Sequence, residues 1–198
     1  MRSIYFLLIF LLTITLAACT TVSPPAPPQT TGWENRVNQL ARIQNFAVSG
    51  KLAARTAQDA GSATVDWKQQ GQQFIIALSG PLGAHAMQLT GTPGKVVLKT
   101  SDGKQFSATS PENLLAERFG FRLPVSNINY WIRGLPVPGQ ASQTEFDNFH
   151  RLSRLSQQGW NISYLNYTNV NGIELPQKMA IDSKALQVKI VIYNWTLR

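Results

Sequence analysis

From residue 46 to the C-terminus, this chain repeatedly alternates apolar and polar side chains and breaks the alternation with glycine and proline. The clearest case is near the C-terminus, where Leu186, Val188, Ile190 and Ile192 occupy every second position. A period of two residues is typical of β-strands with one buried face. Short strands separated by glycine or proline turns pair as antiparallel neighbours, so the pattern restricts the fold to an antiparallel sheet, sandwich or barrel.

The same alternation predicts strands within residues 46–55, 63–68, 74–78, 85–89, 96–98, 150–155 and 160–165, with others near 106 and from 143. In 150–155 it places Leu152 with Arg154 on one face. Three helices are expected, in 33–44, 110–120 and 126–133. The second has the strongest signals, since Ser110 is a good N-cap, Pro111 suits the first turn and Gly120 suits the end.

A single sheet of this length must cover its apolar face, and curling around the predicted helices would do so. If the helices cover it incompletely, an apolar cavity remains, and cavities of this kind hold apolar ligands. Periodicity alone leaves a filled core and a cavity equally open.

The N-terminus has the layout of a secretory signal. Met1-Arg2-Ser3 precedes an apolar run over residues 4–16, which is too short to span a bilayer. Leu16-Ala17-Ala18-Cys19 resembles a bacterial lipobox, in which the cysteine receives diacylglycerol and an amide-linked acyl chain such as palmitate. An ordinary secretory signal that ends near a cysteine is the alternative. Cys19 is the only cysteine, so no disulfide can form within the chain.

These signals divide the chain into a signal peptide (1–18), a lipidated N-terminus with a proline-rich tether (19–32) and one domain (33–198). Thr20 follows the cysteine. In many Gram-negative bacteria an Asp at that place retains lipoproteins in the inner membrane, so Thr20 favours the outer membrane. We therefore expect a protein held at the periplasmic face of the outer membrane through Cys19.

Several function classes lack their signatures. The basic residues give a formal net charge of +8 but are scattered, which disfavours nucleic acid and leaves solubility or a mild attraction to membranes. No nucleophile elbow, P-loop or dinucleotide motif occurs. The only histidines, His85 and His150, are far apart, and His85 is interpreted as a packed or rim side chain on the Met87/Leu89 face. We expect neither enzyme activity nor a cofactor or metal.

The chain resembles the LolB family of outer-membrane lipoprotein receptors. The likeness spans nearly the whole mature chain, in the right order, and the segment Tyr130-Trp131-Ile132-Arg133-Gly134-Leu135-Pro136 is its most specific part. The other matching segments are the lipobox, Gly80-Pro81-Leu82-Gly83 with Ala84 to Leu89, Gln158-Gly159-Trp160 with Tyr164 and Tyr167, Leu175-Pro176 with Met179, and Asn194-Trp195.

The resemblance implies a mainly β fold, an unclosed antiparallel half-barrel covered by short helices and enclosing an apolar cavity. It also implies a monomer that accepts the acyl chains of lipoproteins from the periplasmic carrier LolA and inserts these lipoproteins into the phospholipid of the outer membrane. A structural outer-membrane lipoprotein with a solid β core, acting as an envelope assembly scaffold, is the alternative. A hydrolase of lipid or cell wall is a third, for which no site is found.

Two sets of residues are candidates for this function. The turn around Leu82 is one. By sequence alone, Leu82 is favoured to fold back onto the rim, but the resemblance implies an exposed apolar residue used in membrane insertion. The other set faces the expected cavity: Val48, Leu52, Phe74, Ile76, Leu78, Met87, Leu89, Trp131, Leu152, Ile162, Ile190 and Ile192.

Lipidation of Cys19 is directly testable. We expect mass spectrometry of the mature N-terminus to find an acylated cysteine, and Cys19→Ala to yield a soluble periplasmic or uncleaved form. The domain of this variant should remain folded, because the tether separates it from the anchor. An unmodified Cys19 at the mature N-terminus would contradict the lipoprotein assignment.

Overall fold

The computed structural model describes residues 32–198. The signal peptide, Cys19 and the tether up to residue 31 lie outside these residues. The first described element is helix α2 (Gly32–Ala41), which ends three residues earlier than the sequence pattern suggested. The two remaining helices, α3 (Pro111–Phe119) and α4 (Val125–Trp131), follow each other in the middle of the chain.

The strands form one antiparallel sheet of eleven, in the order β6-β5-β4-β3-β2-β1-β11-β10-β9-β8-β7. Within residues 32–198 the sheet does not close, because β6 and β7 pair on one side only. In chain order the strands are β1 (Asn45–Arg55), β2 (Ala60–Gln70), β3 (Gln73–Ser79), β4 (Met87–Thr92), β5 (Lys95–Thr100), β6 (Gln105–Ala108), β7 (Ser142–Phe146), β8 (Leu152–Gln157), β9 (Trp160–Val170), β10 (Ile173–Asp182) and β11 (Gln187–Leu197).

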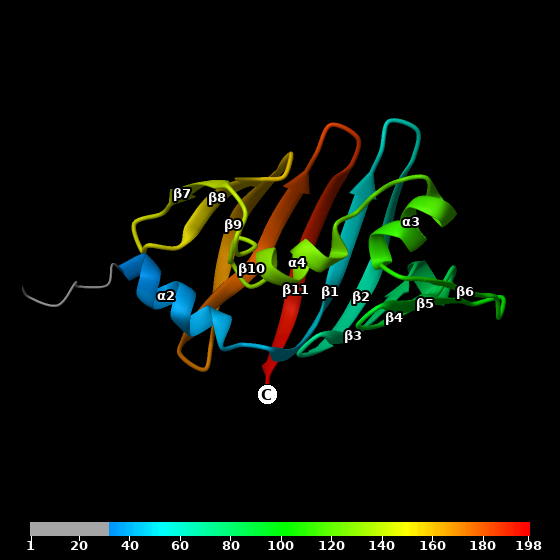
Figure 1. Ribbon diagram of the computed structural model, residues 1–198, viewed down its shortest axis with the longest axis horizontal. Coiled ribbons are helices and arrows are strands. Elements are labelled where there is room, and N and C mark those ends of the chain that lie inside the picture. The colour runs from blue at the N-terminus through cyan, green and yellow to red at the C-terminus, as the bar shows by residue number, and fades with distance from the viewer. Residues whose placement is uncertain (1–31) are drawn as a thin grey trace, which may run out of the picture. The chain divides into compact units, whose positions relative to one another are not determined.

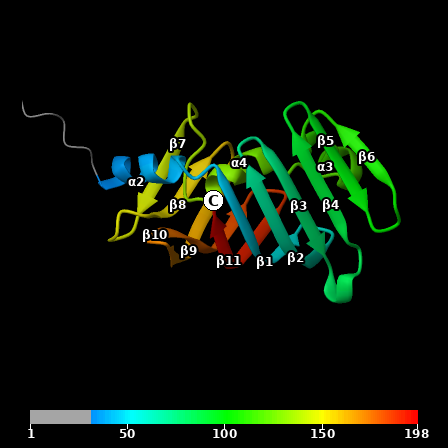
Figure 2. The same ribbon diagram turned by 90° about the horizontal axis from the view of Figure 1, so that it is seen from below.

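The sheet curls around one face, and α3 and α4 lie over that face (Figures 1 and 2). This arrangement confirms the expected fold class, a mainly β protein with an open antiparallel sheet covered by short helices. The helix signals in the middle of the chain are also confirmed. The Ser110 side chain accepts a hydrogen bond from the backbone N–H of Asn113 (3.2 Å), and Gly120 closes α3.

The register of the strands lines up apolar side chains across the sheet. Val48 pairs with Trp67 and Trp67 with Ile76, and the same row continues through Leu89 and Leu98 to Phe106 on β6. Because side chains opposite each other in paired strands share a face, this row forms a continuous apolar band under the helices.

Strand β10 was not among the predicted strands, and it contains Pro176, although proline is a poor residue for a sheet interior. In the structure the β9–β10 register shifts around Pro176 and Lys178, and β10 pairs with β11 only from Lys178 onward. The missing N–H of Pro176 therefore falls where no β11 ladder bond is made. Its carbonyl oxygen instead accepts from Trp195 Nε1 at 3.0 Å.

Two side-chain assignments were wrong. In β8, Leu152 and Leu155 are both buried while Arg154 is exposed, because the β7–β8 register shifts by one residue between Glu145 and Phe146. A bulge of this kind lets two residues that are three apart share a face. His85 is exposed, with φ +50°, because β4 begins only at Met87. It therefore does not share the strand face assigned to it.

The close approach of β1 and β11 yields a stability prediction. A Cβ at Gly50 would overlap the carbonyl oxygen of Val191, whereas a Cβ at Gly61 on β2 would meet nothing within 4 Å. We expect Gly50→Ala to lower the free energy of unfolding by about 1–3 kcal/mol or more, and the control Gly61→Ala to change it by less than about 0.5 kcal/mol. Urea denaturation measures both. Equal effects of the two changes would show that the contact at Gly50 does not limit stability.

Candidate functional site

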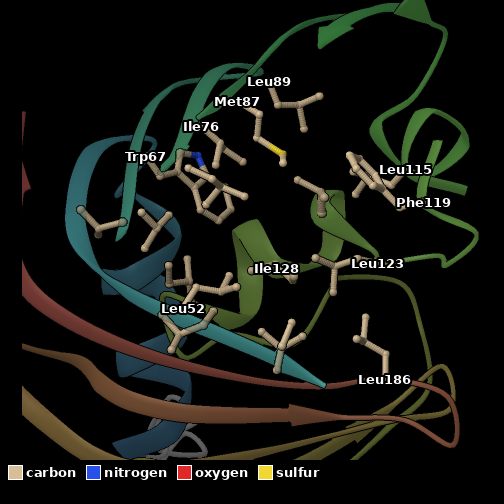
Figure 3. A pocket seen from close by; sticks show the side chains of 18 of the residues that line it. Leu52, Trp67, Ile76, Met87, Leu89, Leu115, Phe119, Leu123, Ile128 and Leu186 are labelled. Carbon is tan, nitrogen blue, oxygen red and sulfur yellow. The ribbon is translucent and has the colours of Figure 1, made fainter. Parts of the chain in front are cut away.

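A pocket of about 240 Å³ lies between the concave face of the sheet and helices α3 and α4 (Figure 3). On the same measure a single water needs only about 10–15 Å³. The floor of the pocket is the apolar row from Val48 to Leu98, and its roof comes from Leu115 and Phe119 on α3 and Ile128 on α4. The helices thus bridge the row without filling the space above it.

The lining is almost entirely apolar, since Ser49 is the one polar residue among the described residues that form it. Trp67 carries the only other polar group, and its indole Nε1 donates to Gln69 Oε1 at 2.9 Å. Gln69 in turn donates from Nε2 to the carbonyl oxygen of Gly71 at 2.7 Å. Because a buried polar group is costly unless it is paired, this chain of bonds leaves an apolar surface for a ligand.

The structure brings eight of the twelve cavity candidates together in this pocket: Val48, Leu52, Ile76, Leu78, Met87, Leu89, Ile190 and Ile192. Sequence reasoning missed the contribution of the helices and the segment that joins them. These residues are Leu115, Phe119, Phe121, Leu123, Val125, Ile128 and Ile132, joined by Leu186 in the β10–β11 turn. The spacing of Leu115 and Phe119, four residues apart on α3, was the available signal.

The other four candidates lie elsewhere. The ring of Phe74 occupies the space over Gly91, its partner on β4, and so turns from the pocket into a neighbouring polar hollow. Trp131, Leu152 and Ile162 are at most 1% exposed and belong to solid core. Leu152 lies on β8 and Ile162 on β9, and Trp131 packs against this part of the sheet, away from the pocket.

The segment from Tyr130 to Pro136 covers the part of the concave face over β8 and β9. Hydrogen bonds attach it to these strands. Trp131 Nε1 donates to Gln157 Oε1 on β8 (3.0 Å), and Tyr164 on β9 donates from its hydroxyl to the carbonyl oxygen of Trp131 (2.9 Å). Burial raises the pKa of Tyr164 well above its usual value, so this donor keeps its proton at physiological pH.

Buried Arg133 extends the same attachment, donating from Nε to the carbonyl oxygen of Asn129 (2.8 Å) and from Nη1 to that of Ile43 (2.7 Å). Burial lowers its pKa, although the group stays far from neutrality at physiological pH. The specific segment found in the sequence is therefore a structural plug, and the apolar pocket lies over the other half of the sheet.

The two roof helices are linked by a hydrogen bond, and the roof is open at one edge. The carboxylate of Glu112 on α3 accepts a hydrogen bond from the backbone N–H of Ser126 on α4 at 2.9 Å. Beyond this link, Phe119 at the end of α3 lines the pocket and yet is 41% exposed. An apolar chain can therefore reach the pocket from solvent beside Phe119.

Leu82 is the middle residue of a short 3-10 turn, η1 (Pro81–Gly83), between β3 and β4. The connection is closed by a hydrogen bond from the N–H of Gly80 to the carbonyl oxygen of Ala84 (2.8 Å). The β3–β4 pair nearest to this connection, Leu78 with Met87, lines the pocket. The turn that carries Leu82 therefore starts and ends at the rim of the pocket.

Within residues 32–198, no three His, Cys, Asp or Glu side chains gather as they would around a metal ion. His85 belongs to the β3–β4 connection and His150 to the β7–β8 connection. Over the same residues, no helix combines the length and the hydropathy needed to cross a bilayer. The pocket under α3 and α4 is suited to binding an apolar ligand.

Comparison with known proteins identifies relatives over most of the chain. Residues 44–195 match the family described as outer membrane lipoprotein LolB. An outer-membrane lipoprotein LolB of Pseudomonas putida is 41% identical over 166 residues, which is 84% of this chain and 81% of the relative. The one from Ectopseudomonas mendocina is 39% identical over 196 residues, 97% of this chain and 96% of the relative.

Solved structures share the fold at low sequence identity. A LolA superfamily protein from Nitrosomonas europaea superimposes with a TM-score of 0.53 at 8% identity, covering 85% of this chain and 94% of that protein. A DUF1329 family protein from Desulfovibrio piger gives 0.54 at 7% identity, covering 84% and 91%. The open sheet with helices over one face is therefore shared with these proteins.

The same substitution should have different effects in the pocket and in the solid core. Leu52 lines the pocket, whereas Leu152 is fully buried away from it. We expect Leu52→Asp to remain folded and to bind an apolar fluorescent probe roughly tenfold or more weakly, because an unpaired carboxyl in an apolar site costs more than the 1.4 kcal/mol of a tenfold change. Leu152→Asp should unfold the domain. Circular dichroism and probe titration measure the two effects. If Leu52→Asp also unfolds the domain, Leu52 belongs to solid core.

Proposed function

The chain belongs to the LolB family of outer membrane lipoproteins, and we propose that it receives acylated lipoproteins from the periplasmic carrier LolA and inserts them into the outer membrane. Anchored through lipidated Cys19 at the periplasmic face of that membrane, it works as a monomer and carries out no chemical reaction. The cargo is recognised by its acyl chains.

The observation that carries this proposal is the apolar pocket under α3 and α4. Burial of an acyl chain gains about 0.8 kcal/mol per CH₂, so about fifteen methylenes gain about 12 kcal/mol. A pocket with an apolar lining and one open edge can hold part of such a chain away from water. The polar end of the lipoprotein remains outside, where its peptide is solvated.

The direction of transfer follows from relative affinities. The chain has no P-loop to couple transfer to a nucleotide, so each step must run downhill. The receptor needs to bind acyl chains more tightly than the carrier does, by about 1.4 kcal/mol for each tenfold bias, and less tightly than the bilayer. A partly open pocket suits this middle position, because a fully enclosed chain would be released more slowly.

A scaffold with a solid core is the alternative function. The part of the sheet beneath Trp131 fits such a protein, but the hollow above the row from Val48 to Leu98 does not. Empty apolar space costs stability, by about 24 cal/mol per Å³ when it is created by mutation. A chain with a scaffolding role alone has no reason to retain it.

Insertion is assigned to the turn that carries Leu82. A leucine that enters lipid gains about 1.5–3 kcal/mol, which biases docking at the bilayer without anchoring the protein. We expect Leu82→Glu to accept lipoproteins from loaded LolA normally and to block their insertion into vesicles. The matched control is Leu165→Glu, which makes the same change at a leucine on β9 that is 56% exposed.

The two steps are measured separately, by transfer of labelled lipoprotein from LolA to the receptor and by its later appearance in floated vesicles. Normal insertion by Leu82→Glu would remove the turn from the delivery step. If Leu82→Glu loses acceptance from LolA while insertion is unaffected, the turn acts in the contact with the carrier instead. Failure of the unaltered protein to take lipoprotein from LolA would overturn the proposed function itself.

A further inference from the structure

The connection between β7 and β8 presents Phe149 to solvent. Its side chain is 73% exposed, more than the other exposed large apolar residues of the described chain. Phe146, at the end of β7, is 42% exposed and packs on Trp33 of α2 with ring centroids 4.9 Å apart. We call Trp33, Phe146 and Phe149 the aromatic patch. An exposed apolar patch on a protein surface often marks a contact with a partner or a membrane.

The backbone under Phe149 is held by a network of hydrogen bonds. Asp147 Oδ1 accepts from the backbone N–H of Phe149 (2.9 Å) and from that of Arg151 (3.0 Å), and Asp147 Oδ2 pairs with Arg151 Nε (2.8 Å). Burial alone would raise the pKa of Asp147, but these bonds outweigh it and lower the pKa. The carboxyl group of Asp147 is therefore ionised at neutral pH, the form that accepts these hydrogen bonds.

Arg151 ties this turn to the sheet. Its Nη1 pairs with Glu174 on β10 at 2.8 Å, and its guanidinium lies 4.8 Å from the ring centroid of Phe149 and 4.5 Å from that of Tyr167. The backbone that carries Phe149 is thus braced, and its ring contacts Arg151 while most of the side chain remains exposed. Phe149 is therefore available for contact with a partner.

The position of the patch identifies that partner. Both views show the β7–β8 connection beside the start of α2 (Figures 1 and 2), and a Cβ at Gly32 would lie 3.4 Å from the ring of His150. A groove is lined on one side by Gly32 and Arg36 of α2 and on the other by Phe149 and His150. The patch therefore lies beside the start of α2, where the proposed anchored segment joins the domain.

Residues 20–31 separate this point from Cys19. The thirteen residue steps from Cys19 to Gly32 span at most about 47 Å when fully extended, so an anchor at Cys19 keeps the start of α2 within that distance of the bilayer. Tethering of this kind gives an effective concentration in the millimolar range, at which the affinity of one or two aromatic side chains for lipid is sufficient. A carrier in solution has no such proximity to this end of the domain.

We propose that the aromatic patch is a bilayer-contact surface, in which Phe149 enters the lipid interface and fixes the orientation of the anchored domain. This inference rests on the anchored receptor proposed above. The charges beside the patch are balanced, since two cations, Arg36 and Arg151, face two carboxylates, Asp147 and Glu174. The contact is therefore hydrophobic, and it does not require anionic lipid. Aromatic residues are well suited to this role, because they favour the membrane–water interface.

The test uses the full, lipidated chain in vesicles of zwitterionic phosphatidylcholine that carry a nitroxide quencher on the acyl chain. Phe149→Trp adds an indole to the patch, and Leu165→Trp adds one to β9 at a leucine that is 56% exposed. We expect the added emission of Phe149→Trp to shift to the blue and to be quenched at least twofold more than that of Leu165→Trp. Both variants should bind an apolar probe as the unaltered chain does.

Several outcomes would overturn the inference. Equal quenching of the two indoles would show that the domain has no preferred orientation. A Phe149→Trp indole already shielded from acrylamide without vesicles would show that another part of the chain covers the patch. A shift produced by LolA, but not by vesicles, would make the patch a carrier site. If the chains float with the vesicles but the Phe149→Trp indole stays unquenched, the patch is not a bilayer contact, although the anchor holds. If the chains do not float, the anchored receptor is overturned as well.

Discussion

The register of the β-strands is the constraint on which the rest of the structure depends. It places Val48, Trp67, Ile76, Leu89 and Leu98 side by side on five neighbouring strands, all on one face. An apolar band of this width is strongly unfavourable in water, and an open sheet has no second sheet to cover it. Two short helices and one plug segment must do so. Where they fit closely the core is solid, and where they only bridge the band a pocket remains.

The solid and hollow halves have different purposes in this account. The plug around Trp131 is bonded through Gln157 and Tyr164, which gives the domain a rigid half that does not depend on a ligand. The hollow half forgoes close packing, and a loss of dispersion contacts normally lowers stability. An acyl chain would restore those contacts while it is bound. Under the proposed function, the rigid half would allow the other half to be empty between cargoes, and the β3–β4 turn at the rim of the pocket would join binding to delivery.

Much of this could be predicted from the sequence, because alternation of apolar residues reports which face a strand buries. Eight pocket residues and the helix from Ser110 to Gly120 followed from such local patterns. The errors arose where tertiary contacts override the pattern. A bulge turned Leu155 inward beside Leu152, and Pro176 was tolerated where β10 pairs with β9 but not with β11. No period of two or 3.6 residues could indicate that Trp131 fills one half of the face, or that Asp147 braces a turn carrying an exposed aromatic ring.

The central claim is that acyl chains of lipoproteins occupy the hollow half of the concave face. Transfer of a lipoprotein with a photoreactive acyl chain from LolA, followed by irradiation and mass spectrometric mapping, tests it most directly. We predict that the cross-links fall on pocket residues such as Leu52, Trp67, Leu89 and Phe119. Cross-links confined to the convex face of the sheet, or to the surroundings of Trp131, would contradict the account.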